Sequence, residues 1–179
     1  MADLPPFARI AVACSLAALA LFAQGARADE YTDVNRLVQA KQYDEALARA
    51  DKYLAAKPRD PQMRFLKGVI QADSGKRSDA IATYTQLTLE YPVLAEPYNN
   101  LAVLYAQENE YQKAREALEG AVRANPDYAT AWENLGDVYA KLAGQSYAKA
   151  QHSDPSNAGA PAKLALVRQL LSSTQATAR

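Results

Sequence analysis

The chain has 179 residues, of which 20 are basic and 20 acidic, so its formal net charge is +0. This balance gives no electrostatic basis for binding nucleic acid or an anionic membrane surface. Glycine is sparse, with 7 residues, and alanine is abundant, which favours a mostly helical chain.

The N-terminal segment has the order of a bacterial secretory signal peptide. Arg9 precedes an apolar run over residues 10–22, and a small-x-small sequence follows at 26–28. We expect a signal peptide over 1–28, cleaved after Ala28, and a mature chain that is periplasmic or secreted. The alternative is an uncleaved membrane anchor. The length of the run disfavours it, because a transmembrane helix needs roughly 20 apolar residues.

After this segment, residues recur at a fixed interval. Pro58, Pro92 and Pro126 are each 34 residues apart. An alanine column has the same period: Ala46, Ala80, Ala114 and Ala148. Late in the chain, the run Tyr98, Leu101, Ala102, Tyr105 is echoed by Trp132, Leu135, Gly136, Tyr139. This pattern resembles the tetratricopeptide repeat, a 34-residue helix–turn–helix unit.

The resemblance implies an all-α fold, an α-solenoid of antiparallel helix pairs, over residues 29–172. We expect repeats at about 27–60, 61–94, 95–128 and 129–158. The predicted pairs are Asp29–Lys41 with Asp44–Ala56, Pro61–Ser74 with Arg77–Tyr91, and Ala95–Glu108 with Tyr111–Ala124. Asp60 is the expected N-cap of the helix that begins at Pro61. Between paired helices, Gly75 and Asn109 suit a left-handed backbone.

The fourth repeat departs from the period. Its first helix is expected over Ala129–Leu142. Its second helix is expected to be short, near Gln145–His152, since Asp154-Pro155 arrives five residues before the next proline of the repeat is due.

A last amphipathic segment follows Pro161. Leu164, Val167 and Leu171 share one face at helical spacing. We expect a capping helix over 160–172 that covers the apolar end of the array, with a helix that docks on a partner as the alternative. Residues 173–179 are expected to form a disordered tail.

Most aromatic residues are expected to pack inside the repeats. Tyr84, Tyr105, Tyr111 and Tyr139 match aromatic columns, and Trp132 occupies the signature position of its repeat. Such side chains bury large areas between helices.

No group of residues has the pattern of a catalytic or metal site. His152 is the only histidine, and Cys14, the only cysteine, lies within the predicted signal peptide. A metal would therefore find too few ligands, and the sequence has no glycine-rich phosphate loop and no nucleophile elbow. We expect no enzyme activity, no metal and no cofactor.

The resemblance implies that the first helices line a concave groove that holds a peptide or helix of another protein. The expected groove residues are Tyr31, Asn35, Gln62, Phe65, Asn99, Asn100, Val103, Glu133, Asn134 and Asp137. Amide side chains both donate and accept, which suits a peptide backbone. For Asn100 and Asn134 a role in hydrogen bonds between repeats is equally open, whereas Asn99, Glu133 and Asp137 have less structural reason to be there.

The groove lacks the basic clamp with which chaperone-binding relatives hold a C-terminal carboxylate. Its acidic residues favour a neutral or basic partner segment. The leading hypothesis is a non-enzymatic protein interaction module of the bacterial cell envelope, with no contact to nucleic acid, or to the membrane after signal cleavage. The alternatives are a self-associating structural component, with Leu164–Leu171 or the edge of the first repeat as the contact, and an accessory subunit of an envelope assembly or enzyme complex. The sequence leaves the oligomeric state open.

Overall fold

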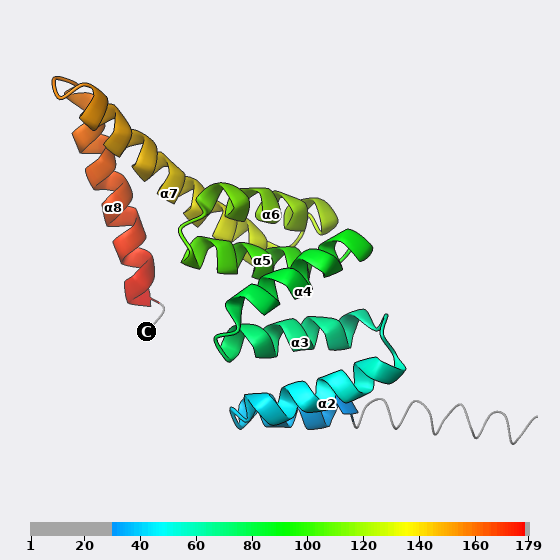
Figure 1. Ribbon diagram of the computed structural model, residues 1–179. Coiled ribbons are helices and arrows are strands. Elements are labelled where there is room, and N and C mark those ends of the chain that lie inside the picture. Colours follow the sequence, from blue (N-terminus) through cyan, green and yellow to red (C-terminus); the bar gives the residue numbers. More distant parts are fainter. Residues whose placement is uncertain (1–29, 178–179) are drawn as a thin grey trace, which may run out of the picture. The chain divides into compact units, whose positions relative to one another are not determined.

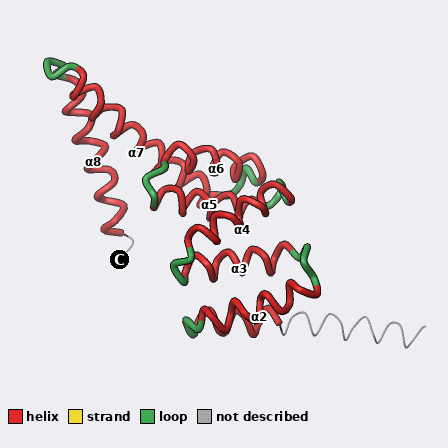
Figure 2. Tube along the Cα trace, viewed as in Figure 1, coloured by secondary structure: helices red, strands yellow, loops and turns green. Residues whose placement is uncertain are grey.

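The computed structural model describes residues 30–177, so the predicted signal peptide over 1–28 lies outside the described residues. The described chain is helical, with no strand in it (Figures 1 and 2). A helix over residues 30–39 is followed by α2 (Tyr43–Ala56), α3 (Pro61–Asp73), α4 (Arg77–Glu90), α5 (Ala95–Gln107), α6 (Tyr111–Ala124), α7 (Ala129–Ser153) and α8 (Gly159–Thr177). The predicted all-α helical repeat fold is confirmed. These helices form two compact units, over residues 30–74 and 75–177.

Three turns between consecutive helices contain a residue with a left-handed backbone. Lys41, Gly75 and Asn109 have φ angles of 58°, 78° and 60°, and they are spaced by the 34-residue period. At Asn109 two backbone hydrogen bonds close the turn, from Asn109 N–H to Ala106 O at 3.0 Å and from Glu110 N–H to Tyr105 O at 2.9 Å. This is the glycine-type helix end that reverses a chain within a few residues.

The fourth repeat does not reverse, and the predicted break after Leu142 was wrong. The structure has one continuous helix, α7, from Ala129 to Ser153. The residue at the turn position is Ala143, for which a left-handed backbone costs about 1–2 kcal/mol while the helix interior is its best environment. The predicted helix end before Asp154-Pro155 is confirmed. Proline disfavours the α conformation at the residue that precedes it.

A second reason for the straight helix lies in the residues that would have to be buried. Where α6 buries Ala117 and Leu118, the fourth repeat carries Gln151 and His152. Folding this segment back would bury polar groups without partners, which costs free energy. Both residues are exposed in α7.

Helix α8 runs back alongside α7 (Figure 1). Asn157 caps its start, with Oδ1 accepting hydrogen bonds from the backbone N–H groups of Gly159 and Ala160 at 3.1 and 3.0 Å. Leu164 is buried, and the helices approach closely: a Cβ atom on Gly144 would lie 3.4 Å from Val167 Cγ1. Helix α8 extends to Thr177, so it includes residues 173–177 of the segment that the sequence analysis assigns to the tail.

In the first unit, one carboxylate joins three helices. Asp60 is the N-cap of α3, as predicted, and its Oδ1 accepts from the N–H groups of Gln62 and Met63. The same carboxylate accepts hydrogen bonds from the hydroxyls of Tyr31 at 2.6 Å and Tyr53 at 2.8 Å. The cap therefore also fixes the helix over 30–39 against α2 and α3. The core beside it contains Val34, Leu37, Ala46, Ala50, Tyr53, Met63 and Ile70.

In the second unit, small residues allow helices to pack closely. Ala80 and Ala114 are fully buried. A Cβ atom on Gly120 would lie 2.6 Å from the Tyr98 ring, so the ring of α5 lies directly on the α6 backbone. Ala148, in the same sequence column as Ala114, is exposed because α7 does not fold back.

The expected burial of two aromatic residues on α7 was wrong. Trp132 and Tyr139 are 52% and 48% exposed, although Tyr84 on α4 is 1% exposed as expected. The Trp132 indole N–H donates to the Pro126 carbonyl at 2.8 Å, and the Tyr139 hydroxyl donates to Glu119 Oε1 at 3.2 Å. Both side chains lie where a second helix would cover them in a complete repeat.

The alanine column gives a matched pair of substitutions. We expect Ala114→Leu to lower the free energy of unfolding by about 1–3 kcal/mol, because the larger side chain overpacks a fully buried site. The same substitution at exposed Ala148 should change it by less than about 0.5 kcal/mol. Urea unfolding followed by circular dichroism measures both. Equal losses at the two positions would contradict the different packing of the third and fourth repeats.

Because the Tyr31 hydroxyl donates to Asp60, we expect the fold to lose stability at alkaline pH. Burial raises the pKa of the Tyr31 hydroxyl, and the hydrogen bond to Asp60 raises it further. A raised folded-state pKa means that this group stabilises the fold below the unfolded-state pKa, near 10, and that the contribution is lost as the pH rises above that value. Tyr31→Phe should lower stability at pH 7 and weaken its decline above pH 10, as measured by urea unfolding across that range. A constant difference between the two proteins over the whole range would contradict this assignment.

Candidate functional site

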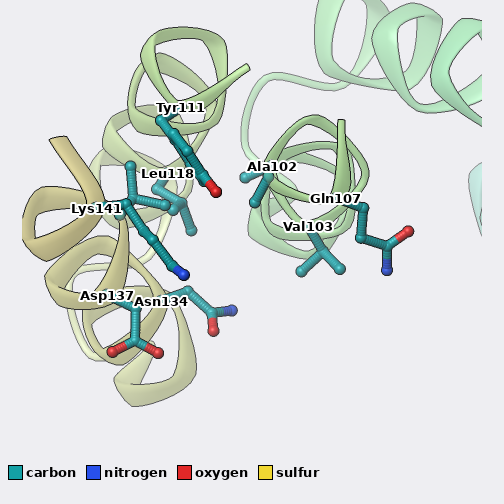
Figure 3. Close-up of a pocket in the computed structure, with 10 residues that line it drawn as sticks. Ala102, Val103, Gln107, Tyr111, Leu118, Asn134, Asp137 and Lys141 are labelled. Atoms are coloured by element: carbon teal, nitrogen blue, oxygen red, sulfur yellow. The ribbon is translucent and has the colours of Figure 1, made fainter. Parts of the chain in front are cut away.

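The second unit contains a pocket of about 330 Å³ between α5, α6 and α7. Figure 3 shows its lining side chains, with the Lys141 ammonium and the Tyr111 hydroxyl directed toward the space between α5 and α7. The lining residues are Ala102, Val103, Ala106 and Gln107 from α5, Tyr111 and Leu118 from α6, and Asn134, Asp137, Val138 and Lys141 from α7.

The pocket has an apolar floor. Ala102 and Leu118 are each 1% exposed, and Val138 is 5% exposed. Val103 is 38% exposed and adds an accessible apolar surface at the edge. The volume lies at the lower end of the range for ligand sites, roughly 300–1,000 Å³. It therefore suits one or two apolar side chains of a larger partner.

The rim carries both signs of charge. Asp137 and Lys141 are four residues apart on α7, so they lie on the same side of the helix. Both side chains are partly exposed, and neither of them makes a hydrogen bond or an ion pair within the described chain. Gln107 and Asn134 add amide groups, of which Gln107 Oε1 accepts from Arg77 at 3.2 Å and Asn134 Nδ2 donates to Asn99 at 2.8 Å. The rim thus offers polar partners to a backbone or to charged side chains around an apolar anchor.

Asparagine side chains join three helices beside the pocket. Asn134 Nδ2 on α7 donates to Asn99 Oδ1 on α5 at 2.8 Å. Asn100 Nδ2 donates to the Tyr84 hydroxyl on α4 at 3.2 Å, and Asn99 Nδ2 lies 3.4 Å from Asn100 Oδ1. This network connects successive repeats, which is the role that the sequence left open for Asn100 and Asn134.

The structure also gives Asn99 a structural role that the sequence pattern did not indicate. Asn99 is 5% exposed, and its amide is engaged on both sides. Two adjacent asparagines on one helix turn toward different neighbours, and the repeat positions alone do not distinguish them. Asn99 is therefore poorly accessible to a partner in this structure.

The predicted groove residues fall into separate places. Val103, Asn134 and Asp137 line the pocket, whereas Glu133 is exposed outside it. Four others belong to the first unit: Tyr31, Asn35, Gln62 and Phe65. Of these, Asn35 and Gln62 are exposed, Phe65 is half-buried, and the Tyr31 hydroxyl is bonded to Asp60.

The sequence did not predict that α6, the second helix of the third repeat, lines the pocket. Tyr111 and Leu118 come from α6, whereas the groove was expected from first helices alone. Their signal in the sequence is that of ordinary packing residues, an aromatic and a leucine at helical spacing.

Two chemical features are absent from the part of the chain that the structure describes. It has no group of three or more His, Cys, Asp or Glu side chains placed to hold a metal ion. It also has no helix with the length and apolar character required to span a bilayer.

The asparagine network can be tested through stability. We expect Asn134→Ala to lower the free energy of unfolding by about 1–3 kcal/mol, because the buried Asn99 carbonyl oxygen loses its donor. Asn35→Ala is the matched control, since Asn35 is exposed on a helix and should change stability by less than about 0.5 kcal/mol. Chemical unfolding of the two variants distinguishes them. Equal stability of both would contradict the structural role of the network.

Comparisons with known proteins agree with this architecture. A tetratricopeptide repeat protein from Arabidopsis thaliana, the chloroplastic protein PYG7, is 41% identical over 69 residues, which cover 36% of this chain and 23% of that protein. The chain thus spans about a quarter of this relative's length. The crystal structure of MamA matches with a TM-score of 0.58 and 25% identity, over 76% of this chain and 82% of the other.

A third match, with 17% identity, is the first repeat domain of Spaghetti (RPAP3) bound to the HSP90 peptide SRMEEVD. Its TM-score is 0.58, and the match covers 63% of this chain and 89% of the other. Two family models match the sequence itself: the tetratricopeptide repeat model over residues 31–95 and 71–120, and the TPR repeat model over residues 104–142. These matches extend from the helix over 30–39 into α7. The chain belongs to the tetratricopeptide repeat family.

Proposed function

We propose that this chain is a protein interaction module of the bacterial cell envelope, and that it holds a segment of another protein in the pocket between α5, α6 and α7. The observation that carries the proposal is the pocket itself, with its apolar floor at Ala102 and Leu118 and its charged rim at Asp137 and Lys141. Such a combination anchors an apolar side chain and orients the polar groups around it.

The family supports the general task. Tetratricopeptide repeat proteins are in general non-enzymatic modules for protein–protein interaction, and the fold of the RPAP3 domain has been solved with a peptide bound. That match has 17% identity, so it supports peptide binding as a use of the fold and leaves the peptide's sequence open.

The charges around the pocket indicate the chemistry of the bound segment. Glu133 and Asp137 on α7 carry negative charge. Lys141 on α7 and Arg77 on α4 carry positive charge, and the Arg77 guanidinium donates to Gln107 Oε1 at 3.2 Å. The partly exposed carboxylate of Asp137 on the pocket rim would attract basic groups of a bound segment. We therefore expect an apolar anchor residue flanked by neutral or basic residues.

The proposed location in the cell envelope is based on the N-terminal sequence. The order of Arg9, the apolar run and the small residues at 26–28 is that of an exported protein. A module delivered to the periplasm by such a signal would meet its partner there.

The proposal can be tested by partner capture with single substitutions on accessible valines. Val103→Lys places a charge at the apolar edge of the pocket, whereas Val93→Lys makes the same change at a position in the second unit that is 78% exposed and outside the pocket. Full-chain protein carrying either change is used to capture proteins from the organism's own envelope, with mass spectrometry as the readout. We expect specific partners to be retained by wild type and Val93→Lys and lost with Val103→Lys. Capture of the same proteins by all three would reject the pocket.

A charge reversal tests the chemistry of the segment that is bound. With a peptide covering the captured region, Asp137→Lys should weaken binding about tenfold or more if the segment is basic. The effect should shrink as salt is raised, since exposed charges are screened. Tighter binding to Asp137→Lys would show that the segment is acidic and overturn the charge preference.

A further inference from the structure

Helix α7 has an aromatic face that is open to solvent. Trp132 and Tyr139 are 52% and 48% exposed, and Gly136 lies between them. Residues four and seven positions apart lie on one side of a helix. A Cβ atom on Gly136 would have nothing within 4 Å. The face therefore has a shallow centre bordered by two aromatic rings.

The third repeat shows what normally covers such a face. Its equivalent residues are Tyr98, Ala102 and Tyr105 on α5, and α6 packs on them. Ala102 is 1% exposed, and Tyr98 lies against the backbone of α6 at Gly120. A helix with small residues at its contact surface is thus the natural complement of this pattern.

The chain's own next segment does not cover the face of α7. Residues 145–153 continue α7 in a straight line. Helix α8 packs on α7 through Leu164 and Val167 near Gly144, which leaves Trp132 and Tyr139 exposed. Among the described residues, neither the end of α7 nor α8 covers this face.

A second uncovered apolar surface lies on α8. Leu166 and Leu170 are 66% and 57% exposed and are one helical turn apart. Ala162 and Ala165 are exposed beside them, so the surface combines small and large apolar residues. This is the composition that the face of α7 requires.

One charge on each surface is complementary to the other. Lys163 is exposed and lies three and seven residues before Leu166 and Leu170, on the same side of α8. The face of α7 is bordered by Glu133, which is also exposed. Opposite charges around an apolar contact favour and orient association.

We propose that a second copy of this chain covers the face of α7, with Leu166 and Leu170 of its α8 placed over Gly136 between Trp132 and Tyr139. Each copy carries both surfaces, and the proposed dimer is the two-fold symmetric one in which this contact occurs twice. The pocket residues Asn134, Asp137 and Lys141 lie on another side of α7, so the dimer leaves the pocket accessible. This inference is independent of the proposed partner binding.

The dimer can be measured with a reporter that lies in the contact. Trp132 is the only tryptophan of the chain, so tryptophan emission reports on this face alone. With the full chain, we expect sedimentation velocity to show a monomer–dimer equilibrium and the tryptophan emission to shift to shorter wavelength as the dimer forms. Leu166→Glu with Leu170→Glu should raise the dimer dissociation constant about tenfold or more and abolish the shift.

A second variant changes the α7 side of the contact. Gly136→Lys fills the shallow centre of the face, and the open space around Gly136 allows α7 to accept the side chain. It should remove the dimer without loss of helical circular dichroism. The matched control is Leu89→Glu with Val93→Glu, at residues that are 77% and 78% exposed and lie outside both surfaces. This control should dimerise like wild type.

Three outcomes would overturn the proposal. The first is a wild-type chain that stays monomeric up to about 100 µM, well above the micromolar range of weak specific dimers. The second is association that persists unchanged in both the Leu166/Leu170 and the Gly136 variants. The third is a dimer that forms without any change in Trp132 emission. A monomer whose Trp132 emission shifts only with a different protein would assign the face to a helix of that protein instead.

Discussion

Between the two helices of a regular repeat, the backbone of this chain passes through the left-handed region. Glycine and asparagine reach that region at low cost, and Gly75 and Asn109 lie in it. Lys41 adopts the same conformation in the first repeat. At the fourth position of this series stands Ala143, and the chain continues as a helix. Because lysine pays a backbone cost similar to that of alanine, the turn residue acts together with the polar residues Gln151 and His152, which occupy positions that α6 buries.

Helix α7 makes contacts on several of its sides. On one side Asn134, Asp137, Val138 and Lys141 line the pocket together with α5 and α6. On another side Trp132 and Tyr139 have no covering helix, because the fourth repeat does not fold back. Its C-terminal half provides the surface on which α8 packs, near Gly144. Both candidate contact surfaces of this unit therefore include residues of α7.

Most of the regular helices could be predicted from the sequence because their signals are local. Proline at each repeat end, the Asp60 cap and the left-handed residues lie within a few positions of the structures they specify. The pocket was less predictable. Val103, Asn134 and Asp137 were assigned from repeat positions, but the α6 residues that complete the pocket resemble ordinary core residues. Asn99 was assigned to the groove because a repeat position does not show which way an amide side chain is hydrogen-bonded.

The sequence by itself determined the repeat, the helix pairs and the columns of small residues, since these depend on local backbone preferences and helical periodicity. Only the tertiary structure decided which faces of those helices are covered. Trp132 and Tyr98 occupy the same repeat position, yet one is half exposed and the other lies against α6. The physical reason is that burial depends on whether another helix is present across the contact. In the fourth repeat, alanine at the turn and polar residues at the would-be buried positions prevent that helix from folding back.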